Sequence, residues 1–131
     1  MRILGFQKLD WMNFDTHHPK LLYVTFTTFR LARRDRDWEF GEVVRVVLKP
    51  RTKERLILGE AEIIQKAPKE KFGIGETRIT DVEARADGFR EIWDLERFLF
   101  FRRNRDNRTA NKITLRWRLW YPPMMEFALR N

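Results

Sequence analysis

The chain has 131 residues, of which 43% are hydrophobic and 14% aromatic, so it can form one packed core and global disorder is excluded. It has no cysteine, which excludes disulfides, thiolate nucleophiles and cysteine metal sites. No apolar run approaches the roughly 20 residues of a membrane span, and the opening MRILGFQKLDW places a charge too early for a secretory signal. We therefore expect a single domain over residues 1–131, in the cytoplasm.

Positive charge is concentrated in one segment. The net charge is +8 and the pI is near 10.3, which indicates a polyanionic partner. Between residues 97 and 118 there are eight basic residues and one acid, Asp106, so this segment has a net charge of +7. The eight are Arg97, Arg102, Arg103, Arg105, Arg108, Lys112, Arg116 and Arg118. The charged fraction of 35% is also typical of thermophilic proteins.

The first 41 residues are expected to contain one helix and one strand. The helix is expected around Gly5–Met12, and a loop follows at Asp15–Pro19. Leu21–Arg30 (LLYVTFTTFR) is rich in β-branched and aromatic residues, which predicts a strand. The polar, densely charged segment Leu31–Gly41 is expected to be a loop.

Two further strands are predicted in the middle of the chain. Glu42–Lys49 (EVVRVVLK) is apolar on both faces, as in a central or barrel strand, and Pro50–Glu54 forms a turn. Arg55–Gln65 is the third strand, in which Gly59 permits a bend or a close approach of two backbones. Lys66–Arg78 is expected to be a loop, since its Gly-x-Gly pair lacks the context of a phosphate-binding motif.

A short helix is predicted from a capping box. Thr80 and Glu83 have the spacing of an N-cap and its N3 partner, and Asp81 complements the helix dipole. Gly88 is placed to end the helix. Asp87 lies at the C-terminal end, where an acid is unfavourable, so we expect it to face a cleft.

A helix and a strand are predicted in the last part of the chain. Glu91–Arg103 has apolar residues at helical spacing, and Lys112–Tyr121 alternates as a strand does. Ile113, Leu115, Trp117 and Leu119 are expected on one face, and Thr114, Arg116, Arg118 and Trp120 on the other. Pro122-Pro123 ends the strand, and MMEFALRN is expected to be a short helix or a docked tail. The predicted fold class is α+β, with the strands in one mixed, barrel-like sheet and the helices across one end.

Four short motifs occur in an order shared with a known family. They are Thr28-Phe29-Arg30, Phe40-Gly41-Glu42, Gly59-Glu60-Ala61-Glu62 and Ile79-Thr80 followed by Glu83-Ala84-Arg85-Ala86-Asp87-Gly88-Phe89. In this order they resemble the ASCH domain, over a core of about residues 20–121 with an N-terminal extension and a C-terminal tail. The resemblance implies a PUA-like mixed β-barrel, with short helices covering one end and a cleft between barrel and helices. It also implies RNA binding, and one branch resembles an amidohydrolase acting on acetylated cytidine.

The same resemblance implies candidate catalytic residues. The threonine and the acid of the amidohydrolase branch fall on Thr28 and Asp87, and its arginine falls on Arg30. Its lysine falls on Thr25, which cannot supply the charge that activates a threonine hydroxyl, so we expect hydrolysis to be weak or absent. Two alternatives stay open for this group. It forms a polar cleft for a ligand, or an Arg30–Asp87 pair ties the helix to the barrel.

Arginines interleaved with aromatic residues predict binding to single-stranded or looped RNA, because guanidinium groups contact phosphates and rings stack on bases. The candidate residues are Arg30, Arg102, Arg103, Arg105, Arg108, Arg116, Arg118 and Trp120. Trp38, beside Arg33, Arg34 and Arg36, repeats the pattern. The alternative is a solvated, charged surface with cation–π pairs.

No cofactor or metal site is expected. The adjacent His17 and His18 make a poor metal site, and the motifs of nucleotide-binding loops and zinc hydrolases are missing from the sequence. Three hypotheses follow: an RNA-binding PUA-like module, a small hydrolase of a modified nucleoside, and a protein-interaction domain or accessory factor in transcription or translation. The oligomeric state and the choice between RNA and single-stranded DNA stay open.

Overall fold

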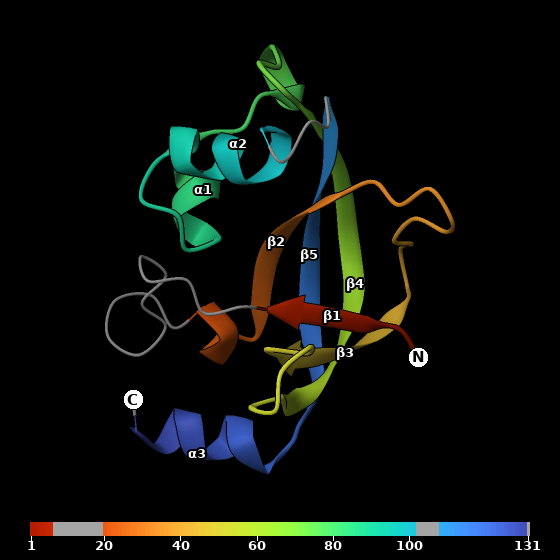
Figure 1. Ribbon diagram of the computed structural model, residues 1–131, viewed down its shortest axis with the longest axis vertical. Helices are drawn as coiled ribbons and strands as arrows, with labels where there is room; N and C mark the ends of the chain where they lie inside the picture. The colour runs from red at the N-terminus through yellow and green to blue at the C-terminus, as the bar shows by residue number, and fades with distance from the viewer. Residues whose placement is uncertain (7–19, 102–107, 131) are drawn as a thin grey trace.

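The computed structural model describes residues 1–6, 20–101 and 108–130, which form a five-stranded mixed sheet curled into a half-barrel, with three short α-helices (Figure 1). The strands are β1 (Ile3–Phe6), β2 (Thr25–Leu31), β3 (Val43–Leu48), β4 (Leu56–Glu70) and β5 (Thr109–Trp120). The α-helices are α1 (Asp81–Ala86), α2 (Ile92–Phe100) and α3 (Pro122–Arg130), and short 3-10 turns occur at Lys20–Leu22 and Gly75–Thr77. The predicted α+β class is confirmed.

The strand order is β1-β3-β4-β5-β2, so the predicted pairing of the last strand with the earlier strands is confirmed. β1 is parallel to β3, and every other pair is antiparallel. The long strands β4 and β5 form the spine of the molecule, with α1 and α2 near one end and α3 near the other (Figure 1). β4 extends to Glu70, five residues beyond the predicted strand, because its ladder with β5 continues to Thr109.

The predicted N-terminal helix around Gly5–Met12 is wrong in its described part. Residues 3–6 form β1 instead, in which Leu4 and Phe6 alternate into the core and pair with β3. This parallel pairing is made with residues some forty positions away, so the local pattern does not indicate it. The rest of that segment and the predicted loop at Asp15–Pro19 lie outside the described residues.

A bulge in β5 reverses the predicted faces of its last residues. Ala61 pairs with Trp117 and Glu60 pairs with Leu119, so Arg118 is an extra residue between the two pairs. Leu119, predicted to share a face with Ile113 and Leu115, is therefore 51% exposed, whereas those two residues are buried. Trp120, predicted to share a face with the arginines, instead packs on the core beside Trp117 (ring centroids 6.3 Å apart). The predicted alternation is correct as far as Trp117.

The open edges of the half-barrel are joined by a side chain. Arg30 on edge strand β2 donates from Nη2 to the carbonyl oxygen of Gly5 on edge strand β1 (2.8 Å). Its guanidinium also lies over the ring of Phe6, 4.9 Å from the centroid. Phe6 in turn contacts Phe26 on β2 edge to face, with centroids 6.1 Å apart. The sheet is therefore closed here by one guanidinium and a ring contact.

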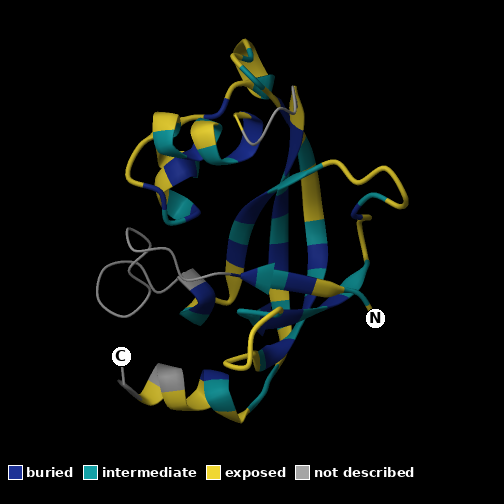
Figure 2. Cartoon of the chain, viewed as in Figure 1, coloured by how far each residue is buried: buried dark blue, intermediate teal, exposed yellow. Residues whose placement is uncertain are grey.

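Within the described residues, the core consists of two hydrophobic clusters. The larger joins buried residues of all five strands and of α3, and the smaller joins β2 and β5 to α1 and α2; Figure 2 colours these buried positions dark blue. Phe29 on β2 and Ala110 on β5 belong to the smaller cluster, together with Leu95, Leu99 and Phe100. The helices are thus held to one end of the spine by apolar burial.

The structure confirms that Gly59 marks a close approach of two backbones. A Cβ atom at this position would lie 2.1 Å from the carbonyl oxygen of Leu119, where β4 and β5 meet beside the bulge. No side chain can be accommodated without separating the two strands.

We expect Gly59→Ala to destabilise the fold by on the order of 3 kcal/mol, because a backbone atom cannot move aside as a side chain can. Gly41→Ala is the control, since a Cβ there meets nothing within 4 Å and only its φ of +84° is unfavourable, at about 1–2 kcal/mol. Urea unfolding of both variants measures the difference. Equal losses of stability would show that the close approach is not a constraint.

Candidate functional site

The predicted capping box is present at the start of α1. Thr80 Oγ1 accepts a hydrogen bond from the Glu83 N–H (3.2 Å), and Glu83 Oε1 accepts one from the Thr80 N–H (3.0 Å). Gly88, with φ of +97°, follows the helix as predicted. The role of Glu83 goes further than capping. Its carboxylate pairs with Lys69 (3.0 Å) and with Lys112 (2.8 Å), so it also ties α1 to β4 and β5.

The pKa of Glu83 reports the strength of this attachment. Burial raises the pKa, but hydrogen bonds from Lys112, the Thr80 N–H and Lys69 outweigh it and lower the pKa from 4.5 to about 2. Lys69 is buried, and its ammonium also donates to the carbonyl oxygens of Glu76 and Arg78. α1 is therefore anchored to the sheet by two groups. One is the Glu83 carboxylate, which stays ionised, and the other is the buried Lys69 ammonium, which makes three hydrogen bonds.

The candidate catalytic residues Thr28 and Asp87 are brought close together, and both are buried. Asp87 Oδ2 accepts a hydrogen bond from the Phe29 N–H (3.3 Å), and Thr28 Oγ1 accepts one from Arg30 Nε (3.3 Å). Phe29 lies on the outer edge of β2, so Asp87 satisfies a main-chain group that has no neighbouring strand among the residues that the structure describes. An acid at the C-terminal end of α1 is explained by this bond. Both side chains are enclosed, with exposed fractions of 3% for Thr28 and 4% for Asp87, and the expected cleft between barrel and helices stays a prediction.

The predicted arginine set is spread along the molecule. Arg116 and Arg118 both bind the carboxylate of Glu62, at 3.4 and 3.3 Å, which leaves one net positive charge among the three. Arg108 precedes β5 at its other end, eight residues and roughly 26 Å from Arg116 at the usual rise of a strand. Arg30 is the edge bridge described above. Arg102, Arg103 and Arg105 lie outside the described residues.

The second predicted aromatic element is wrong, because Trp38 is buried. The guanidinium groups of Arg2 and Arg33 lie over its ring, with Cζ 4.5 and 5.5 Å from the centroid. Arg2 also pairs with Glu42 and donates to the carbonyl oxygen of Asp37. This tryptophan therefore anchors the loop before β3 and is not a platform for a ligand.

A different group of basic and aromatic residues converges where β4 ends and β5 begins. We call it the basic–aromatic end and define it as Lys71, Phe72, Trp93, Phe101 and Arg108. The Lys71 N–H donates to the carbonyl oxygen of Arg108 (2.8 Å), so the β4–β5 ladder sets the two cations side by side. The ammonium of Lys71 lies 4.3 Å from the ring centroid of Phe101 and 5.7 Å from that of Phe72.

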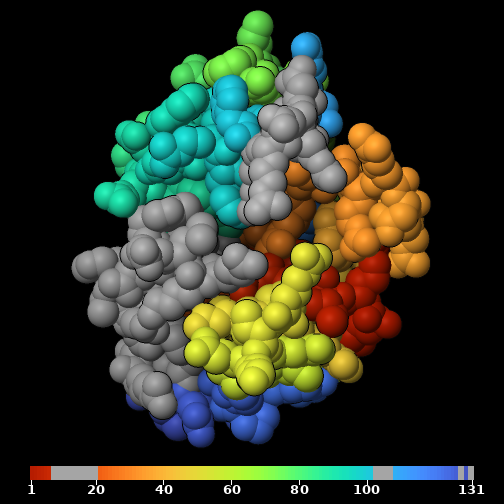
Figure 3. Space-filling view, viewed as in Figure 1, coloured from red at the N-terminus to blue at the C-terminus, as the bar shows by residue number. Residues whose placement is uncertain are grey.

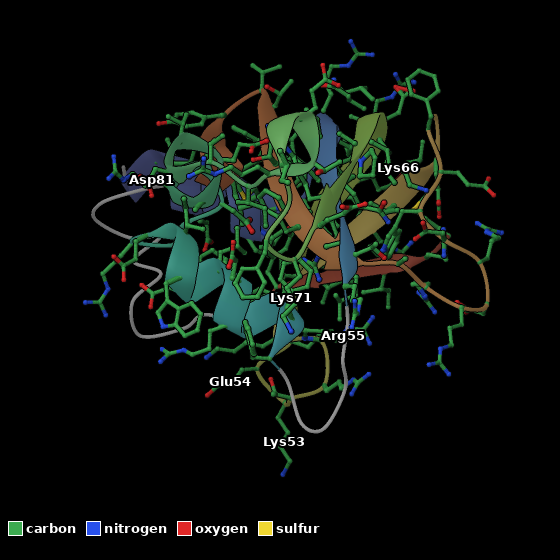
Figure 4. The ribbon with its side chains drawn as sticks, turned by 90° about the horizontal axis from the view of Figure 1, so that it is seen from above. Lys53, Glu54, Arg55, Lys66, Lys71 and Asp81 are labelled. Atoms are coloured by element: carbon green, nitrogen blue, oxygen red, sulfur yellow. The ribbon has the colours of Figure 1, made fainter. Side chains whose placement is uncertain are left out.

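The rings of the basic–aromatic end are in contact and exposed. Phe101 lies 6.2 Å from Phe72 and 5.5 Å from Trp93, between centroids. The exposed fractions are 66% for Phe72, 49% for Trp93 and 45% for Phe101. Figure 4, which is seen from this end, shows Lys71 close to α2, and Figure 3 shows the end of β4 beside the two helices on one continuous surface.

A pocket opens beside these residues. It has a volume of about 520 Å³ and is lined by Glu70, Lys71, Phe72, Arg108 and Thr109. This volume is in the range of pockets that take small ligands. The lining therefore includes two cations, one aromatic ring and one acid, Glu70.

Sequence reasoning missed four of the five residues of the basic–aromatic end. One usable signal was the spacing of Trp93 and Phe101, which are eight residues apart and can therefore lie on one face of a helix. Another was the Lys71-Phe72 pair directly before Gly73, where a basic and an aromatic residue precede a turn. The convergence itself depends on the β4–β5 register, which no local pattern provides.

Two other types of site are absent from residues 1–6, 20–101 and 108–130. Within these residues, no group of three His, Cys, Asp or Glu side chains is arranged to hold a metal ion, and no helix has the length and hydropathy to cross a membrane. His17 and His18 lie outside the described residues. Comparisons with protein-family models, curated proteins and solved structures find no match to the chain. The resemblance to the ASCH domain stays a prediction.

We expect the attachment of α1 through Glu83 to make stability depend on pH. Because the folded-state pKa is about 2 and the ordinary value is 4.5, the stabilisation is complete above about pH 5 and is lost as the pH falls towards 2. Glu83→Gln should cost on the order of 2–3 kcal/mol at pH 7, and its difference from the unmodified chain should shrink at low pH. Urea unfolding between pH 2.5 and 7 measures this.

The control for this experiment is Glu54→Gln, which breaks an exposed pair with Lys49 in the turn after β3. Exposed ion pairs contribute little, so a much smaller effect is expected. A difference for Glu83→Gln that does not change with pH would show that packing, and not the ionised carboxylate, holds α1.

Proposed function

We propose that the chain is an RNA-binding module and that the basic–aromatic end is its main contact surface. The observation that carries the proposal is the placement of Lys71 and Arg108 side by side in the lining of a pocket, next to exposed rings. Cations contact phosphates and exposed rings contact bases, so this combination fits a nucleic-acid strand.

The charge of the chain supports the same surface. Phe101 and Arg108 bound the segment 102–107, which contains three arginines and one acid. With Arg108, residues 101–109 have a net charge of +3, and this excess lies in sequence between two residues of the basic–aromatic end. Such a concentration raises the local potential and attracts a polyanion.

The other residues predicted to bind RNA are expected to contribute less to binding. Arg116 and Arg118 share the carboxylate of Glu62, so a phosphate would have to compete with an existing partner. Trp120 is turned towards the core. The hydrolase hypothesis is favoured less than RNA binding, because Thr28 and Asp87 are buried and a substrate would have to displace the groups that cover them.

The proposal predicts a salt-dependent affinity that is lowered by Lys71→Gln with Arg108→Gln. If each cation contacts one phosphate of a single strand, the slope of log affinity against log salt should become about 1.4 units shallower, at about 0.7 per contact. Fluorescence anisotropy with single-stranded, hairpin and duplex RNA at several salt concentrations measures the affinity. Arg103→Gln with Arg105→Gln should give a similar loss.

The matched control is Arg116→Gln with Arg118→Gln, which also removes two positive charges but at the far end of β5. We expect a smaller change, because Glu62 already neutralises part of this charge. An equal or larger loss in the control would move the contact surface away from the basic–aromatic end. Absence of RNA binding at low salt would refute the proposed function and favour the protein-interaction hypothesis.

A further inference from the structure

The backbone at Phe72 holds an aromatic ring out into solvent. Phe72 has φ of +55°, in the left-handed region that bulky residues rarely adopt. The turn around it is fixed by the Gly73 N–H, which donates to the carbonyl oxygen of Glu70 (3.0 Å), and by Thr77, whose hydroxyl donates to the carbonyl oxygen of Ile74 (2.9 Å). A glycine would suit position 72 better on conformational grounds, yet the chain has phenylalanine there.

Packing within the chain does not account for this ring. Phe72 remains 66% exposed although it contacts Phe101, so most of its surface is hydrated in the free protein. The turn also requires glycine at position 73, since a Cβ at Gly73 would lie 2.6 Å from the carbonyl oxygen of Thr77. An exposed ring on a strained backbone is a pattern found at ligand-binding positions.

The cations beside the ring indicate what the ligand is. Lys71 lies within 6 Å of the centroids of both Phe72 and Phe101, and Arg108 is held next to Lys71 by the main chain. A base and its phosphate are separated by one sugar, so one nucleotide can reach a ring and a cation of the pocket lining at the same time. Glu70 also lines the pocket and repels phosphate, which favours placing the phosphate beside Lys71 and Arg108.

We propose that Phe72, supported by Phe101, is a stacking platform for one unpaired base, whose flanking phosphate is bound by Lys71 and Arg108. This inference rests on the proposed function and specifies its substrate class as unpaired nucleotides in RNA. The bases of a duplex are stacked on each other and their faces are inaccessible, so the platform selects single strands, loops and ends.

The test uses the full chain and a short single-stranded RNA that carries one 2-aminopurine, whose fluorescence is quenched when it stacks. We expect quenching on binding, and Phe72→Leu should remove the quenching and weaken single-strand binding by about fivefold or more. The affinity for a duplex of the same length and the slope of the salt dependence should stay unchanged, because no phosphate contact is lost.

Two further variants control for folding. Phe40→Leu makes the same change at a ring that is 77% exposed in the loop before β3, and it should bind as the unmodified chain does. Phe72→Gly suits the left-handed backbone, so its melting temperature should not fall while its single-strand affinity falls as in Phe72→Leu. A loss of binding that accompanies a loss of stability in both Phe72 variants would overturn the inference.

The outcomes separate this inference from the function on which it rests. If RNA binds with a salt dependence that needs Lys71 and Arg108 but Phe72→Leu has no effect, only the stacking platform is refuted. If Phe72→Leu weakens single-strand and duplex binding equally, the ring supports the loop and does not select unpaired bases. If no RNA binds at low salt, both proposals are refuted and a protein partner becomes the better explanation of the exposed rings.

Discussion

The pairing of β4 with β5 is the constraint on which the rest of the structure depends. Its ladder runs from Gly59 and Trp120 at one end to Glu70 and Thr109 at the other. At the first end, the bulge at Arg118 and the close backbone approach set which side chains enter the core. At the other end, the last hydrogen bonds of the ladder define the positions of Lys71 and Arg108. A change in register anywhere along it would alter both ends.

Several acidic side chains join elements within the chain, and each offsets the charge of the basic residues that it binds. Asp37 accepts hydrogen bonds from Lys66 and Asn111, and although burial raises its pKa, these bonds and those from main-chain N–H groups lower it to about 2. Glu83 ties α1 to the sheet, and Glu62 binds two arginines of β5. The distribution of positive charge on the surface therefore depends on which basic side chains these acids pair with, as well as on the number of basic residues in the sequence.

Local chemistry made much of the fold predictable. The β-branched and aromatic runs indicated β2, β3 and β4, and the spacing of Thr80 and Glu83 located the start of α1. The predictions failed where the structure depends on distant partners. β1 forms because residues far along the chain pair with it, and the faces of β5 reverse at Arg118 because of the register with β4. Tertiary structure likewise pairs Glu83 with Lys69 and Lys112, and brings Phe72 into contact with Phe101. No spacing in the sequence indicates these contacts.

The two edges of the half-barrel have main-chain groups that another strand could use. Val24 accepts a hydrogen bond from the Trp117 N–H, so alternate residues of β2 face β5 and Phe29 faces outwards. Its N–H is taken by Asp87, and the outward carbonyl of Gly5 is taken by Arg30. Edge strands with unsatisfied groups are templates for intermolecular pairing and aggregation. Asp87 and Arg30 therefore each occupy a main-chain group on one edge, which hinders the pairing of these edges with neighbouring molecules when the protein is concentrated.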